Sequence, residues 1–325
     1  MGLRGRNFRG RIMKAIPYIF FGGLIFAGSC SDMTDPASGK RVDVEYSATK
    51  AHGLDELESV AVLVFDRKGQ LDALSCNNEG KVKMSVAAGE DLEYRVLANA
   101  PEAMFEKILS IADFKALRVR LNQNILIGKG REKFMEGTVV SVSLERPFSK
   151  IRLEKITPAF YGKSYHGSKA FLERVFIINT PSEALLEEDS ECPSHWYNKM
   201  SLDPNPKALL VKELHREISG NSDMELGLEF ICIPNVIDNA VSSLNNKLWS
   251  PRNTRLVAEI SMDGKAYYYP VTMPAMKRNR IYKISKLVMQ TSGSGHPDEP
   301  VLRESMKFSI EIMPWKNETK EYPLE

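Results

Sequence analysis

The sequence predicts an all-β protein built from antiparallel β-sandwiches, with one or two short helices. Apolar and polar residues alternate over many short segments, a pattern typical of strands that bury one face. Helical periodicity is confined to residues 101–117 and 181–189. Many short strands with few helices indicate sandwiches rather than an α/β fold.

The N-terminus predicts an export signal over residues 1–29. Residues 1–14 carry basic groups and no acid, and the following apolar run, 15–27, is shorter than the ~20 residues that a membrane-spanning helix needs. Small residues then precede Cys30. A signal anchor with an incidental cysteine is the alternative, and Met13 offers a second start codon besides Met1.

The residues around Cys30 resemble the lipobox of bacterial lipoproteins. That resemblance implies cleavage before Cys30, attachment of lipid such as palmitate to its thiol, and a membrane-tethered chain. Residues 30–41 are polar and form the expected tether.

Charge gives no argument for a nucleic-acid partner. The chain has 44 Lys+Arg and 42 Asp+Glu. Five of the basic residues and none of the acidic ones lie within residues 1–29, so the mature chain has a net charge of about −3.

Among the remaining cysteines, Cys76, Cys192 and Cys232, one disulfide is possible but the sequence does not assign it. Cys232 lies in a strand-like run and is most simply a buried apolar residue.

The strand-like segments follow one another along the chain. The first is 42–49, with Val42, Val44 and Tyr46 on one face. Residues 59–65 are apolar on both faces, as in a central strand. Asp263-Gly264 predicts a type I′ hairpin. The other expected inward residues are Val82, Met84, Val86, Leu92, Tyr94, Val96, Val140, Val142, Leu144, Ile151, Leu153, Leu226, Leu228, Phe230, Cys232, Met306, Phe308, Ile310 and Ile312.

Other segments predict a helix, a turn and a domain seam. Residues 101–117 open with Pro101 and predict one helix, and 181–189 predict a shorter second one. Residues 127–133 predict a basic turn. The seam at 145–150 contains Pro147 and divides the chain into predicted domains 42–146 and 147–315.

No catalytic, metal or cofactor motif is recognisable. Cys192 and His195 lack a second pair at zinc spacing, and the other histidines are scattered. The sequence therefore predicts a protein that is not an enzyme and binds neither metal nor cofactor.

The order of several segments resembles the fimbrillins, the type V pilins of Bacteroidales. Residues 266–271, 278–301 and a closing strand ending at Trp315 resemble the C-terminal domain of that family. The segments 58–71, 94–100 and 140–156 match the order of its N-terminal domain. The resemblance covers roughly residues 42–315 and implies two transthyretin-like sandwich domains.

Membership would imply assembly by donor-strand exchange at the outer surface. In the family a protease cuts after a basic residue behind the first strand, and the C-terminal strand of a neighbouring subunit fills the opened groove. The matching basic residue here is Lys50, where the family commonly has arginine. A solvated surface lysine is the alternative, and Arg41 is a second basic candidate. The expected donor is the tail 316–325 beside Trp315, with Tyr322 and Leu324 as its large apolar residues, although a frayed terminus has the same composition.

Three functions fit the sequence. The first is a structural subunit of a cell-surface fimbria that contributes to adhesion, with neighbouring subunits, a processing protease and the outer membrane as partners. The second is a non-polymerising lipoprotein such as a pilus anchor. The third is a glycan-binding lipoprotein. Carbohydrate-binding surfaces usually expose aromatic residues, whereas Trp196, Trp249 and Trp315 are dispersed along the sequence, which counts against this function.

Overall fold

The structure is a computed structural model, in which the described residues are 40–49, 57–78, 80–121, 123–161, 169–188, 193–199, 207–218, 222–240 and 249–315. The predicted signal peptide, Cys30, Lys50, Cys192, Tyr322 and Leu324 lie outside these residues. Within them no helix is both long enough and apolar enough to cross a membrane.

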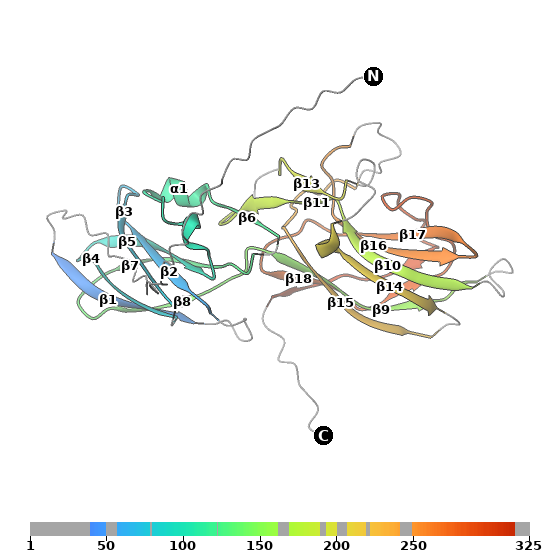
Figure 1. Ribbon diagram of the computed structural model, residues 1–325, viewed down its shortest axis with the longest axis horizontal. Helices are drawn as coiled ribbons and strands as arrows, with labels where there is room; N and C mark the ends of the chain where they lie inside the picture. Colours follow the sequence, from blue (N-terminus) through green and yellow to red (C-terminus); the bar gives the residue numbers. More distant parts are fainter. Residues whose placement is uncertain are drawn as a thin grey trace, which may run out of the picture. The chain divides into compact units, whose positions relative to one another are not determined.

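Strands make up nearly all of the regular secondary structure of the described chain (Figure 1). The strands are β1 (Arg41–Thr49), β2 (Val60–Phe65), β3 (Leu71–Asn77), β4 (Lys81–Ala87), β5 (Asp91–Ala98), β6 (Arg118–Arg120), β7 (Leu126–Lys133), β8 (Val139–Ser143), β9 (Ser149–Pro158), β10 (Ala170–Ile178), β11 (Thr180–Pro181), β12 (Glu183–Leu185), β13 (Trp196–Tyr197), β14 (Val211–Ile218), β15 (Met224–Cys232), β16 (Arg255–Met262), β17 (Lys265–Thr272), β18 (Arg280–Ile284), β19 (Leu287–Met289), β20 (Met306–Lys307) and β21 (Glu311–Pro314). The helical elements are η1 (Glu102–Met104), α1 (Ile111–Lys115) and η3 (Ala208–Leu210). The all-β prediction is confirmed.

Two sheets enclose the first core. One has the order β4-β1-β8 and the other β3-β2-β5-β7. The inward residues of β1, β4 and β8 pack against alternate residues of β2 and β5, including Val62 and Val96. The opposite face of β2, with Leu63 and Phe65, packs against the segment around Phe114. Both faces of β2 are therefore buried, as its continuous apolar run predicts.

Two further sheets enclose a second core. One has the order β14-β10-β16-β17; the other has the order β20-β19-β9-β18-β21, with β15 also paired to β9. Ile151 and Leu153 of β9 pack in the same cluster as Leu172 of β10 and Ile260 of β16. The predicted domain limits, 42–146 and 147–315, remain a prediction, although the interval between β8 and β9 coincides with the expected seam.

The strand pairing is mainly antiparallel, but not throughout. β1 pairs with β8 in parallel, and β9 pairs in parallel with both β18 and β19. Alternation along a strand reports which face is buried and carries no information about the direction of the neighbouring strand. The parallel pairs were for this reason not predicted.

The single helix predicted over 101–117 is partly correct, whereas the helix predicted over 181–189 and the basic turn predicted over 127–133 were wrong. Residues 101–117 form η1 and α1 separately, and Ser110, the N-cap of α1, makes a capping box with Asp113. Residues 180–185 form β11 and β12 rather than a helix, because β12 pairs with β6. Residues 127–133 belong to β7, a full strand paired with β5. Long-range pairing overrides local propensity in these last two segments.

The Asp263-Gly264 hairpin is confirmed, with φ of 49° and 79° between β16 and β17.

The row of inward apolar residues predicted near the end of the chain is only partly correct. Phe308, which lies between β20 and β21, is 38% exposed, and Ile312 of the edge strand β21 is 53% exposed. Cys232 is a buried free thiol as expected, and burial raises its pKa to about 12. Cys76 is disulfide-bonded.

Candidate functional site

The candidate site is β1, the strand whose removal the family resemblance implies. It occupies the centre of its three-stranded sheet, where Val42–Ser47 pair antiparallel with β4 and Glu45–Thr49 pair in parallel with β8. Two backbone bonds from the preceding loop complete the β8 side, from Gly137 N to Asp43 O and from Glu45 N to Thr138 O. Without β1, both neighbouring strands would lose their pairing partner.

The inward face of β1 fills a continuous part of the first core. Val42, Val44 and Tyr46 are buried, as predicted, and Ala48 packs against the same cluster. Tyr46 is the largest of them. Its ring lies edge-on to Tyr94, with centroids 5.4 Å apart. Removing β1 would thus uncover a row of apolar side chains as well as backbone groups.

The Tyr46 hydroxyl lies in this core with no hydrogen-bond partner among the described residues. Burial also raises the pKa of Tyr46, so the hydroxyl stays protonated and keeps its donor. A buried hydroxyl without a partner loses its hydration and gains nothing in return, which costs about 1–3 kcal/mol. Tyr46 therefore combines strong ring packing with one unfavourable polar atom.

Two glycines of β7 make room for this packing, a role that the sequence did not reveal. Gly130 pairs with Tyr94, and a Cβ at Gly130 would collide with the Tyr94 ring. A Cβ at Gly128 would collide with Val142 of β8. Glycine within a strand marks a close approach of this kind, so the pair Gly128 and Gly130 was a usable signal.

Arg41 begins β1 and anchors it. Its guanidinium lies 3.1 Å and 3.3 Å from the two carboxylate oxygens of Asp72, and Nη2 donates to the Ser85 carbonyl at 2.6 Å. Asp72 also accepts from the Ala87 backbone N–H. Arg41 is thus paired, part-buried and inside a strand, which makes it a poor protease site compared with a residue after the strand.

The other predicted site residues lie in different settings. Lys50 follows the last residue of β1 in sequence and lies outside the described residues, as do Cys30, Tyr322 and Leu324. Trp315 is buried after β21 and belongs to the second group of sheets. Its ring lies 4.8 Å from both the Arg146 guanidinium carbon and the Lys150 ammonium. The structure does not bring Trp315 against β1.

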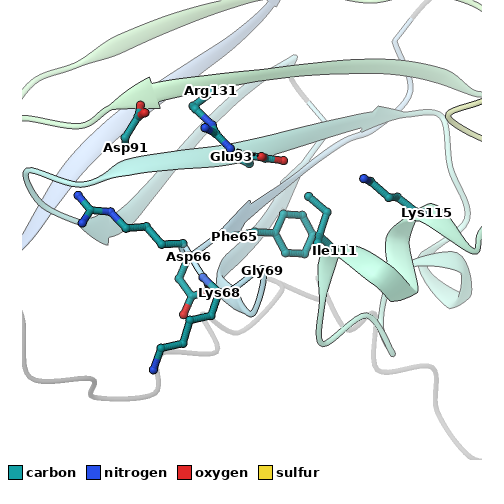
Figure 2. Close-up of a pocket in the computed structure, with 10 residues that line it drawn as sticks. Phe65, Asp66, Lys68, Gly69, Asp91, Glu93, Ile111, Lys115 and Arg131 are labelled. Carbon is teal, nitrogen blue, oxygen red and sulfur yellow. Dashed lines mark hydrogen bonds and ion pairs between the residues drawn. The ribbon is translucent and has the colours of Figure 1, made fainter.

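A cavity of about 600 Å³ lies between the 65–69 turn, β5 and α1 (Figure 2). Figure 2 shows Phe65 beside Ile111, and Glu93 beside Arg131. Glu93 is hydrogen-bonded by Arg131 and lies 3.4 Å from Arg95, and these cations lower its pKa. The carboxyl group is consequently ionised at neutral pH and is no proton donor. Among the described residues, no group of three or more potential metal ligands occurs.

A buried ionic cluster in the second group of sheets was also missed by sequence reasoning. Asp298, in the loop over residues 291–300, accepts from Arg252 at 2.9 Å, Arg255 at 2.6 Å and Asn179 at 2.8 Å. Asp298 and both arginines are fully buried. These contacts fix the 291–300 loop against the start of β16 and are structural.

Comparisons with known proteins identify the fold. No known family model and no curated protein matches the chain. Among solved structures, a Bacteroides eggerthii protein assigned to cell adhesion has a TM-score of 0.65 at 13% identity, covering 86% of this chain and 98% of its own.

Two similar structures are fimbrial proteins of Porphyromonas gingivalis. The fimbrilin FimA of strain W83 has a TM-score of 0.61 at 14% identity, over 85% of this chain and 98% of its own. The tip fimbrial protein Mfa3, with a C-terminal truncation, has a TM-score of 0.54 at 14% identity, over 85% of this chain and 100% of its own. The chain therefore has the fimbrillin fold, as the sequence resemblance indicated.

Proposed function

We propose that this protein is a structural subunit of a cell-surface fimbria and that it contributes to adhesion. It is exported as a lipoprotein through Cys30, reaches the outer membrane, and polymerises after proteolytic removal of β1. Its partners are neighbouring subunits and a processing protease. The observation that carries the proposal is the central position of β1, paired on both edges and filling the first core, in a chain with the fimbrillin fold.

The physical basis is β-augmentation. An opened sheet presents unpaired backbone groups and an apolar row, and a strand from another molecule can satisfy both. Donor and acceptor are different surfaces of one chain, so each contact is head-to-tail and repeated contacts give an open filament. The donor in this proposal is the segment 316–325.

The test uses purified protein whose chain begins after Cys30. This protein is treated with a lysine-specific protease, and the new N-terminus and the intact mass are determined. We expect a chain starting at Ala51, followed by filaments in electron micrographs. Lys50→Ala should give no chain starting at Ala51 and should stay monomeric, and Arg41→Ala, the matched control, should still be cut after Lys50. Cleaved protein that stays monomeric contradicts the proposal and favours the non-polymerising lipoprotein. A chain from native cells that starts at acylated Cys30 also favours that alternative.

A further inference from the structure

A groove separate from the β1 site lies near Trp315, the last described residue. It has a volume of about 480 Å³. Its lining residues are Leu121, Gln123, Asn124, Arg146, Phe148, Leu209, Lys212, Glu229 and Ile231. Leu121 and Phe148 are buried, whereas Leu209 and Ile231 are 55% and 47% exposed. The groove thus offers apolar surface to an occupant.

Two shared residues place Trp315 at the edge of this groove. Arg146 lines the groove and covers the Trp315 ring at 4.8 Å. Lys150 covers the same ring at 4.8 Å and makes a 2.8 Å ion pair with Glu229, another lining residue. Chain that continues after Trp315 therefore starts beside the groove.

The segment 316–325 has the length and composition to occupy it. Tyr322 and Leu324 are its large apolar residues, and an extended strand advances about 3.3 Å per residue, so Tyr322 can reach roughly 23 Å from Trp315. The segment has three glutamates against two lysines, whereas the groove has two cations, Arg146 and Lys212, against Glu229. Charge and apolar content are complementary.

We propose that in the unassembled subunit residues 316–325 dock in cis onto this groove, with Tyr322 and Leu324 against Leu209 and Ile231. The inference rests on the proposed function for the role of the segment as donor strand. Docking covers the donor's apolar residues until a neighbouring subunit offers a better groove. An intramolecular contact also has the advantage of a high effective concentration over contacts between molecules.

The experiment places the photocross-linking amino acid p-benzoylphenylalanine at position 322 of the uncleaved protein, which retains β1 and so keeps its own acceptor groove closed. The protein is irradiated at high dilution, and cross-linked peptides are mapped by mass spectrometry. We expect links within one molecule to peptides containing Leu209 or Ile231. The double variant Leu209→Asp/Ile231→Asp should lower their yield on the order of ten-fold, the change that about 1.4 kcal/mol of lost contact gives.

Leu302→Asp is the matched control, because Leu302 is exposed and does not line the groove; it should leave the yield unchanged. Links only between molecules, links to other sites, or a yield unchanged in the double variant would overturn the inference. Filament formation by the cleaved protein is measured in parallel. Filaments without the cross-link overturn the docking and leave the proposed function intact, whereas the cross-link without filaments does the reverse.

Discussion

Replacing Tyr46 by phenylalanine should stabilise the protein, although it removes a polar atom from a buried residue. The ring keeps its contacts with Tyr94 and Phe134, at centroid distances of 5.4 Å and 6.0 Å. Only the hydroxyl is lost, and that hydroxyl has no partner within the described residues. Relief of its desolvation should raise the free energy of unfolding by about 1–3 kcal/mol.

Tyr269→Phe is the matched control. Tyr269 is buried as well, but its hydroxyl donates to the Thr291 carbonyl at 2.6 Å. Removing this hydroxyl deletes a good hydrogen bond and leaves the carbonyl short of a donor. The variant should therefore be less stable by about 1–2 kcal/mol.

The assay is urea denaturation of the uncleaved protein, with thermal melting as a second readout. Each kcal/mol should move the melting temperature by about 2–4 °C in a protein of this size class. The two variants should therefore shift the melting temperature and the urea midpoint in opposite directions. If Tyr46→Phe is destabilised as much as Tyr269→Phe, then the Tyr46 hydroxyl is hydrogen-bonded and the argument from its burial is refuted.

Two further predictions concern charged groups. Asp298→Ala should destabilise the protein by about 3–5 kcal/mol, because it leaves the buried guanidinium groups of Arg252 and Arg255 without their carboxylate; an unchanged denaturation midpoint would contradict this. The Asp223 pKa is lowered to about 2, first of all by the hydrogen bond from Lys286 at 2.8 Å. A carboxyl group whose pKa is lowered in the folded protein stabilises the fold at pH values above its ordinary pKa, and this contribution is lost as the pH falls. The difference in urea midpoint between the protein and Asp223→Asn should therefore be full at about pH 6 and disappear between about pH 4 and 2. A difference that persists at pH 2 would contradict that origin.

Local patterns predicted the strands well where one face meets a core. Val42, Val44 and Tyr46 alternate with Asp43 and Glu45, and that alternation alone placed β1 within one residue of its observed start. The same reasoning failed at the other end of the chain, where Phe308 and Ile312 alternate equally well yet are exposed on and beside an edge strand. Alternation states that a strand has an apolar face, but it does not state that another layer covers it.

Contacts between distant segments set the limit of the sequence reasoning at the site itself. Arg41 was visible only as a basic residue near a possible cleavage point, because its Asp72 partner is 31 positions away. Asp298 and the two arginines that it pairs with are likewise brought together only by the fold. Partners so far apart leave no local trace in one sequence, whereas a strand's period of two is local by nature.

The contacts that hold β1 divide into two kinds, and the division bears on why cleavage would be needed for exchange. Backbone pairing to β4 and β8 can be reproduced by any extended strand. The Arg41–Asp72 pair and the Tyr46 packing belong to β1 alone, and the segment 316–325 has only Tyr322 and Leu324 to set against them. While β1 remains covalently attached, it also competes as an intramolecular strand at high effective concentration. A donor with fewer apolar anchors could not displace it under those conditions, so in the proposed mechanism the cut after Lys50, rather than a stronger donor, drives assembly.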